Sequence, residues 1–279
     1  MKITRKFALI ICLLLGACVP SEQNIYVINL DRTPDRYKKV KEEFDKQKVH
    51  CIRFSAIDGY KLDFQNVDTK QFLSSEQKKN FAKYVWKNRP AKYNVFLNGR
   101  KLMQIIVDKV RFSLGEVGVA CSHREIWKKV IENDYDKVII FEDDIAPGED
   151  FKKRLNEYLN DLPDDWDIAY LGVGRRGNKY GYFICVGSIF RDIDNVEGHP
   201  FVAKIQPTNL VYGMYGYAIN KRGAKKLLKA TDESSFPIDD IVFQQGGIDT
   251  GNVKGYVAKK KLIKIIPERS EITNMGRHY

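Results

Sequence analysis

The chain has 279 residues, of which 43% are hydrophobic and 12% aromatic, so it is long enough for one large or two small domains and too apolar for general disorder. Its formal net charge of +11 at pH 7 suggests an anionic partner such as a nucleotide, a phosphorylated glycan, a membrane surface or nucleic acid. An ordinary lysine-rich solvated surface would give the same charge.

The first twenty residues predict a targeting segment that is not part of the fold. The basic stretch "MKITRK" precedes the apolar run "FALIICLLLGACV", which is short for a membrane span but typical of a signal peptide. Leu15-Gly16-Ala17-Cys18 resembles a bacterial lipobox, which implies cleavage before Cys18 and lipid on its thiol. An uncleaved anchor and an ordinary secretory signal are the alternatives. All three place the mature chain at or across a membrane. We expect a membrane-associated protein of the cell envelope, as a lipoprotein or through an N-terminal anchor, with the side of the membrane left open.

The five cysteines fit neither a disulfide framework nor a zinc pattern, because those outside the first twenty residues are odd in number and widely spaced. We interpret Cys51, Cys121 and Cys185 as small buried hydrophobic residues.

The fold is expected to begin with a βαβ unit. Residues 24–30, "NIYVINL", are rich in β-branched side chains and predict a buried strand. A helix should follow, with Thr33 as its N-cap and Pro34 at its first position. Residues 50–60 predict a second strand that ends in a turn at Asp58–Gly59. Strand, helix and strand within about thirty-five residues constitute a βαβ unit.

The pattern along the rest of the chain predicts an α/β protein. Residues 61–114 are less regular, rich in Lys and Asn, and suggest an insertion or a lid. Helices are expected at 115–134, 221–230 (with Asn220 as its cap) and 236–245. Strands are expected at 136–145, 164–174, 211–220, 253–258 and 261–266. Alternating strands and helices favour a sheet that is covered on both faces and binds ligands beyond the carboxyl ends of its strands.

One strand, "VIIFEDDI" at 138–145, ends in three carboxylates. Side chains alternate along a strand, so Glu142 and Asp144 should point to one face and Asp143 to the other. Adjacent carboxylates repel each other, and a hard divalent cation such as Mn²⁺ or Mg²⁺ relieves the repulsion and can bridge a diphosphate. A solvated acidic loop at the end of a strand is the alternative.

Several other residues are weaker candidates. Asp239 and Asp240 stand at an expected helix start, where they could act in catalysis or only cap the helix. His123 falls on the apolar face of its helix, which favours a supporting role over that of a base. Arg32 and Arg36 flank the first strand–helix turn and could meet phosphates or solvent. No module typical of nucleic-acid binding is present, so no nucleic-acid partner is expected.

Together these segments resemble glycosyltransferase family 25, the lipopolysaccharide (LPS) and lipooligosaccharide galactosyltransferase family that also includes collagen galactosyltransferases. "IYVINLDRTPDRYKKVKEEF" resembles the opening of the family, "GEVGVACSHREIWKKVIE" its central helix and "VIIFEDDI" its acidic strand. "YGYAINKRGAKKLL" and "PIDD" resemble two later motifs. The five segments occur in the family's order between about residues 24 and 245.

The resemblance implies a GT-A-like nucleotide-diphospho-sugar transferase fold over residues 21–279, with a mainly parallel central sheet. It implies inverting transfer of a hexose, commonly galactose, from a UDP-sugar to a saccharide or lipid-linked glycan acceptor, with Mn²⁺ or Mg²⁺. Carried over residue by residue, the resemblance implies that Glu142 and Asp144 bind the metal. It implies a nucleotide-binding set made of Asn29, Asp31, Arg32, Asp58, Gly59 and Asp143. The general base would be Asp239 or Asp240, with Glu116 and His123 as further candidates.

Two alternatives stay open. The lipobox-like segment would also suit an exported lipoprotein that keeps the fold as a glycan-binding or interaction module. A different metal-dependent enzyme on a similar sheet, such as a phosphodiesterase, would use the same acidic cluster.

Overall fold

The computed structural model describes residues 24–172, 175–176, 183–184, 194–205, 213–235, 237–238, 242, 247–248 and 250–266. Three features of the sequence analysis lie outside the described residues: the predicted N-terminal targeting segment, Cys185, and the acidic pair Asp239–Asp240.

The chain enters the fold through the predicted βαβ unit, which is confirmed. Strand β1 (Asn24–Asn29) pairs in parallel with β2 (Ile52–Ser55), and helix α2 (Pro34–Lys46) connects them. Pro34 opens the helix as predicted. Thr33 stands at the N-cap position, but the prediction of a side-chain cap is wrong, because its hydroxyl instead donates to the carbonyl of Leu30 (3.3 Å).

The described residues form a central eight-stranded sheet, which confirms the α/β class. Three strand pairs of this sheet (β2–β1, β1–β6 and β8–β15) are parallel and the other four are antiparallel, so the sheet is mixed. Across the sheet the strands are β11 (Asp194–Asn195), β12 (Val202–Lys204), β15 (Gly255–Ala258), β8 (Ile168–Tyr170), β13 (Gly216–Asn220), β6 (Lys137–Glu142), β1 and β2.

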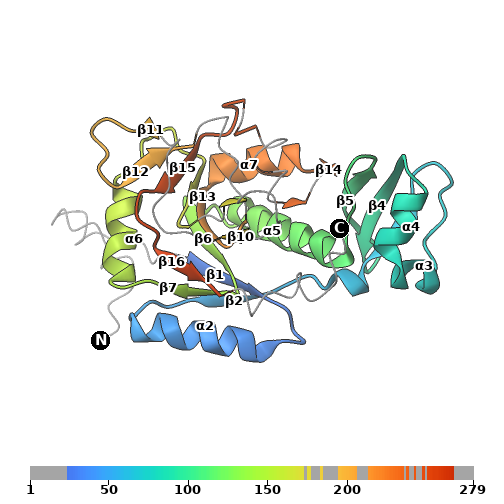
Figure 1. Cartoon of the computed structure of the whole chain (residues 1–279), viewed down its shortest axis with the longest axis horizontal. Coiled ribbons are helices and arrows are strands. Elements are labelled where there is room, and N and C mark those ends of the chain that lie inside the picture. The colour runs from blue at the N-terminus through green and yellow to red at the C-terminus, as the bar shows by residue number, and fades with distance from the viewer. Residues whose placement is uncertain are drawn as a thin grey trace, which may run out of the picture.

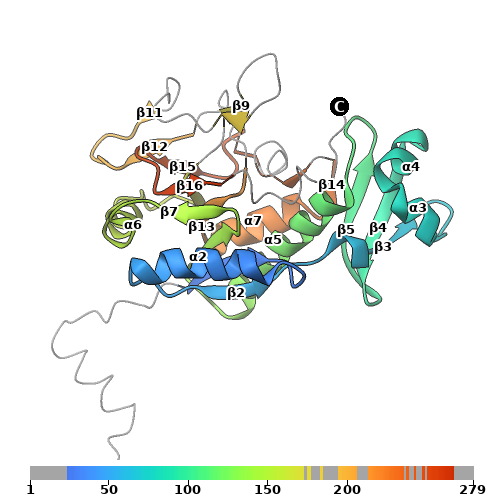
Figure 2. The same ribbon diagram turned by 60° about the horizontal axis from the view of Figure 1, so that its bottom comes forward.

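Helices cover both faces of this sheet, as the sequence predicted (Figures 1 and 2). Alternation along β1 sends Ile25 and Val27 to one face, where α2 and α6 (Phe151–Asn160) pack, and Tyr26 and Ile28 to the other. Helices α5 (Leu114–Glu132) and α7 (Lys221–Ala230) pack on that second face. The two apolar layers make β1 and β6 a rigid base for whatever follows their carboxyl ends.

Residues 61–114, which we call the small lobe, are regular, and the prediction of irregular structure there is wrong. Strands β3 (Asp63–Asn66), β4 (Ala91–Leu97) and β5 (Arg100–Val107) form an antiparallel sheet that β14 (Glu233–Ser234) extends. Helices α3 (Ser75–Lys79) and α4 (Phe81–Lys87) belong to the same lobe, which projects from one end of the molecule (Figure 1). Its apolar side chains, such as Phe64 and Tyr93, join the same core as α5.

The remaining elements are short or close to their predicted positions. Asn220 caps α7 as predicted, since its side-chain oxygen accepts from the amide of Gly223 (2.8 Å). Cys51 and Cys121 are buried and free, as predicted. The sequence patterns did not reveal α6, β11 and β12. Three short pieces complete the description: β7 (Ile145–Pro147) paired with β16 (Ile263–Ile265), the β9–β10 hairpin (Arg175–Arg176 and Phe183–Ile184) and the 3-10 turn η1 (Gly59–Lys61).

Candidate functional site

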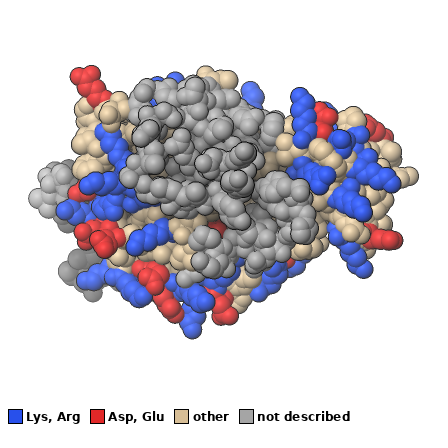
Figure 3. Space-filling model, viewed as in Figure 1, with Lys and Arg blue, Asp and Glu red and all other residues tan. Residues whose placement is uncertain are grey.

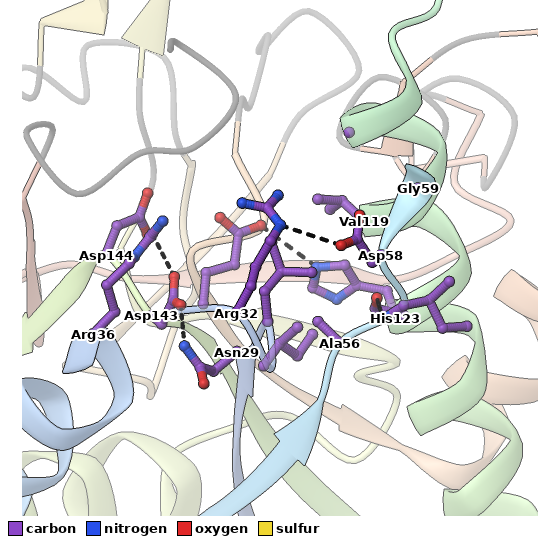
Figure 4. A pocket seen from close by; sticks show the side chains of 16 residues that line it. Asn29, Arg32, Arg36, Ala56, Asp58, Gly59, Val119, His123, Asp143 and Asp144 are labelled. Atoms are coloured by element: carbon purple, nitrogen blue, oxygen red, sulfur yellow. Dashed lines mark hydrogen bonds and ion pairs between the residues drawn. The ribbon is translucent and has the colours of Figure 1, made fainter. Parts of the chain in front are cut away.

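A pocket with an empty volume of about 650 Å³, open to solvent at its mouth, lies at the carboxyl ends of β1 and β6. These strands are parallel neighbours, with Ile28 opposite Glu142, so both end at the same edge of the sheet. The loop after β2, the first turn of α2 and the N-terminal half of α5 form the other walls (Figure 4). Ligands bind in this position in open α/β sheets.

The three carboxylates do not alternate as predicted, because β6 ends at Glu142 and the next two residues form a turn. Asp143 turns toward β1 and α2, where the Nδ2 of Asn29 donates to it (2.6 Å) and Arg36 forms an ion pair with it (Figure 4). Arg53 in turn donates to the Oδ1 of Asn29 (2.8 Å). Asn29 is 1% exposed and Asp143 8%, so this buried network fixes one carboxylate at the pocket floor.

Asp144 has a different environment. It is 4% exposed, and its Oδ1 has no hydrogen-bond partner among the described residues. Burial, with the neighbouring charges of Glu142 and Asp143, raises the pKa of the Asp144 carboxyl well above its ordinary value. A buried, unpartnered carboxylate oxygen in the field of two other carboxylates is a position that a bound cation would stabilise.

Glu142 faces the opposite wall and lies against a buried chain of polar side chains. Its Oε1 is 3.5 Å from the Nε2 of His123, whose Nδ1 is 2.8 Å from the hydroxyl of Tyr217. That hydroxyl accepts from the indole N–H of Trp127 (2.9 Å). Both His123 and Tyr217 are 0% exposed.

The geometry of this chain assigns its protons. An indole N–H can only donate, so the Tyr217 oxygen accepts from Trp127. Burial raises the pKa of Tyr217 well above its usual value, so the phenol keeps its proton. Among the described residues, Nδ1 of His123 is the one acceptor within reach of that proton. His123 therefore carries its own hydrogen on Nε2, aimed at Glu142.

The rim of the pocket is built by the predicted Asp58–Gly59 turn. Asp58 accepts from the amide of Tyr60 (3.1 Å) and forms an ion pair with Arg32 (3.2 Å). Gly59 packs so closely on α5 that a Cβ there would lie 1.8 Å from the carbonyl oxygen of Leu114. Only glycine fits such an approach, which fixes the turn against the helix.

Helix α5 holds the same loop through Ser122 and Gly118. The Oγ of Ser122 accepts from the amide of Ile57 (2.8 Å) and donates to the carbonyl of Gly118 (2.7 Å). A Cβ on Gly118 would come within 2.6 Å of the Ile57 carbonyl oxygen. The sequence "GEVG" at residues 115–118, in the first turn of α5, therefore packs against the rim of the pocket and supports it.

Eight of the twelve predicted site residues line this pocket: Asn29, Arg32, Asp58, Gly59, His123, Glu142, Asp143 and Asp144. Asp31 and Glu116 do not line it. Asp31 is bound by Arg53 and Ser55 (2.8 and 2.9 Å), which lowers the pKa of its carboxyl. Glu116 accepts from the amide and hydroxyl of Ser113 in a capping box at the start of α5.

Two residues that support the pocket, Trp127 and Tyr217, were not predicted, whereas Arg36 was named as a possible phosphate contact. Arg36 lines it beside Asp143, whereas Trp127 and Tyr217 support it from behind His123. Arg36, like Arg32, had been singled out because it flanks the turn between the first strand and its helix. Nothing in the sequence indicates that Trp127 and Tyr217 meet, because they are brought together from α5 and β13 by the fold.

The described residues contain no cluster of three or more His, Cys, Asp or Glu side chains that could enclose a metal ion. Carboxylate oxygens still suit Mn²⁺ or Mg²⁺, which commonly takes one or two protein carboxylates and completes its shell with phosphate oxygens and water. The unpartnered oxygen of Asp144 fits such a partial site. Within the same described part of the chain, none of the helices combines the length and apolar character needed to cross a bilayer.

Comparison with known proteins adds independent evidence. The model of glycosyltransferase family 25 (LPS biosynthesis protein) matches residues 22–242. Human procollagen galactosyltransferase 2 is 24% identical over 222 residues, which are 78% of this chain and 29% of that protein. A glycosyltransferase 25 family member of Aedes aegypti is 28% identical over 225 residues (78% of this chain, 30% of that protein).

A bacterial relative, from Haemophilus influenzae, is 29% identical over 225 residues, which cover 80% of this chain and 63% of the relative. The matched region therefore spans less than a third of the two animal proteins and somewhat under two thirds of this bacterial one. The matches to all three cover more than three quarters of the present chain.

Proposed function

Because this chain belongs to glycosyltransferase family 25, we propose that it transfers a hexose, preferably galactose, from a UDP-sugar to a saccharide hydroxyl with inversion. The observation that carries the proposal is the pocket at the carboxyl ends of β1 and β6, where two arginines and four carboxylates meet. The name of the human relative, procollagen galactosyltransferase 2, supports galactose as the sugar.

The donor would lie with its diphosphate over the turn after β6. Arg36 and Arg32 supply positive charge at this place, and each is already held by a carboxylate, Asp143 and Asp58 respectively. Guanidinium groups suit phosphate because they can donate two hydrogen bonds in one plane. Gly59 and Asp58 would border the nucleotide. Asn29 would hold the Asp143 carboxylate in position beneath it through their hydrogen bond.

A divalent cation, Mn²⁺ or Mg²⁺, would be held by Asp144, with Glu142 in support. When bound, it supplies the positive charge that stabilises a leaving nucleoside diphosphate. The chain's own contribution is to bury Asp144 with its Oδ1 unpartnered among the described residues, and to place Glu142 3.5 Å from the Nε2 of His123.

Inversion needs a single displacement at the anomeric carbon. The acceptor oxygen forms a bond to that carbon as the bond to the diphosphate oxygen breaks, and the acceptor proton passes to a protein base. We assign the base to Asp239 or Asp240. Glu116 and His123 are less suitable, because each is held by the hydrogen bonds described above.

The acceptor we propose is a sugar of LPS or another cell-envelope glycan. The role of the family in LPS biosynthesis, which its description states, supports this acceptor. The apolar N-terminal segment "FALIICLLLGACV" supports association with a membrane, as an anchor or as a lipidated terminus. A glycan-binding lipoprotein of the same fold is the second candidate function, and that segment is the observation that favours it.

One assay separates these functions. The full-length protein is incubated with a panel of UDP-hexoses, Mn²⁺ and envelope glycan, and the release of UDP is measured. We expect UDP release with UDP-galactose that EDTA abolishes. Glycan binding without turnover, unaffected by EDTA, would favour the binding module. Release of UMP instead of UDP would indicate phosphodiesterase chemistry.

A further inference from the structure

The positive charge of this protein is concentrated in the small lobe. Residues 61–114 contain twelve Lys and Arg against four Asp and Glu, a net charge of +8. The first twenty residues add +3, and all remaining residues together, 21–60 and 115–279, are neutral. The whole excess of +11 therefore belongs to two stretches of sequence, and the larger share belongs to one compact part of the fold.

Most of these cations are exposed and not neutralised. Ion pairs bind Lys78 to Asp63, Lys92 to Glu233 and Arg100 to Glu125. Among the described residues, the other nine basic side chains of the small lobe make no ion pair, and all nine are exposed: Lys61, Lys70, Lys79, Lys83, Lys87, Arg89, Lys101, Lys109 and Arg111. On the face shown in Figure 3, basic groups outnumber acidic ones over this lobe.

Three of the lysines recur every fourth residue along the two short helices. Lys83 and Lys87 are one turn apart on α4. Lys79, four residues before Lys83, is the last residue of α3. Residues four apart lie on the same side of a helix. On α4 the spacing therefore keeps Lys83 and Lys87 adjacent, which costs stability unless a partner of opposite charge is present. Lys79 belongs to the preceding helix, which Asn80 separates from α4.

Aromatic rings stand among these cations. The guanidinium of Arg89 lies 3.8 Å from the centre of the Trp86 ring, and that of Arg111 lies 5.1 Å from it. On the same lobe, Phe72 is 56% exposed and packs against the ring of Phe96 (5.7 Å between centroids). Basic side chains interleaved with exposed aromatic rings are typical of surfaces that meet the headgroup region of a bilayer.

We propose that the small lobe docks on an anionic phospholipid surface, through Lys79, Lys83 and Lys87 together with the Arg89–Trp86–Arg111 cluster. The charges are spread over α3, α4 and the segments that follow α4 and β5 instead of converging on one point. Such a spread suits a broad, flat, negatively charged partner better than a single phosphorylated sugar. This inference goes beyond the proposed transfer reaction and does not depend on it.

The lobe is also placed to orient the catalytic pocket. Gly59, on the pocket rim, directly contacts the backbone of Leu114, where the small lobe joins α5.

Vesicle sedimentation of the full-length protein tests the proposal. Vesicles of phosphatidylcholine alone are compared with vesicles that contain about 30% phosphatidylglycerol, at low salt and at about 0.5 M salt. The test variant is Lys79→Glu/Lys83→Glu/Lys87→Glu. The matched control, Lys38→Glu/Lys225→Glu/Lys229→Glu, makes the same change of net charge at exposed lysines of α2 and α7.

We expect wild type and control to prefer anionic vesicles, and salt to abolish that preference. The test variant should bind anionic vesicles at least about 10-fold more weakly than the control, while its binding to neutral vesicles through the N-terminal segment is unchanged. Circular dichroism checks that both variants fold. Equal binding of wild type to neutral and anionic vesicles at low salt would overturn the proposal. So would equal losses in the two variants, or a preference for soluble phosphorylated oligosaccharide over anionic vesicles.

Discussion

The three carboxylates at the end of β6 have three different environments. Asp143 is bound by Asn29 and Arg36, Glu142 faces His123, and Asp144 is buried without a partner for its Oδ1. Sequence reasoning located the cluster but not this division, because strand alternation was applied beyond Glu142, where the strand has already ended. A turn redirects side chains in ways that a period of two cannot describe.

Replacing Asp144 by Asn should separate metal binding from folding. Without metal, we expect the variant to be as stable as wild type or more stable, because a buried charge beside Glu142 and Asp143 is removed. Its affinity for UDP in the presence of Mn²⁺ should fall by more than about 10-fold. Calorimetric titration with UDP and thermal denaturation measure the two effects, with the exposed Asp164→Asn as control. Unaltered Mn²⁺-dependent UDP binding would disprove the assignment.

Replacing Tyr217 by Phe should change the tautomer of His123. In the wild-type protein, imidazole ¹⁵N NMR should show a hydrogen on Nε2 and none on Nδ1. In the variant Nδ1 loses its donor, so a population with hydrogen on Nδ1 should appear. The chain has four histidines, and His123→Asn identifies the relevant signals. A hydrogen on Nδ1 in the wild-type protein would contradict the proposed Trp127–Tyr217–His123 chain.

Among the elements, those with strong local signals were predicted well. Pro34 and the Asn220 cap marked the starts of α2 and α7, and the buried strands β1 and β6 were evident from their β-branched residues. Helix α6 lacks such a signal at its start, since Asp150 stands at its N-cap in a left-handed conformation (φ 51°) without a side-chain cap. Its apolar face, which includes Phe151, Leu155 and Leu159, could have revealed it.

The small lobe held an overlooked signal as well. Asn98 and Gly99 join β4 to β5, and both have positive φ (50° and 77°). This is the conformation of a two-residue hairpin turn, for which Asn-Gly is the preferred sequence. The surrounding lysines and asparagines suggested a less regular insertion or lid, although the alternating apolar residues of the two strands indicate a sheet.

Asp167 ties three elements together and should give the stability of the fold a dependence on pH. It is fully buried and accepts from Lys226 (2.7 Å), Arg222 (2.6 Å) and the amide of Lys254 (2.9 Å). Burial alone would raise the pKa of its carboxyl, but the bonds to Lys226, Lys254 and Arg222 outweigh it and lower the pKa. Because the folded-state pKa is lowered, this stabilisation is present above the unfolded-state pKa and is lost as the pH falls.

Asp167→Asn should therefore lower the free energy of unfolding by about 2–3 kcal/mol at neutral pH. The difference from wild type should shrink as the pH is lowered below the ordinary range of an aspartate, because the wild-type carboxyl is then protonated. Urea denaturation at several pH values measures this, again beside Asp164→Asn. A difference that stays constant with pH would show that Asp167 does not act through its charge.

At the scale of the whole molecule, the order of motifs predicted the family and the α/β architecture, and both are confirmed. The order of motifs could not predict that Asp31 and Glu116 would lie outside the pocket, since each is held by local partners (Arg53 and Ser113). Nor could it predict the concentration of charge on one lobe, which depends on residues 61–114 folding together. Spacing along a chain indicates which motifs are present, whereas contacts between distant segments decide which side chains meet.

The central claim is that the pocket at the ends of β1 and β6 binds the diphosphate of a nucleotide sugar through Asp144 and a divalent cation. A crystal structure of the protein with UDP and Mn²⁺, recorded with anomalous scattering from manganese, tests it most directly. We predict a manganese peak within about 2–2.5 Å of an Asp144 carboxylate oxygen, with a phosphate oxygen of UDP completing the contact. UDP bound outside this pocket, or manganese bound with Asp144 uninvolved, would contradict the claim.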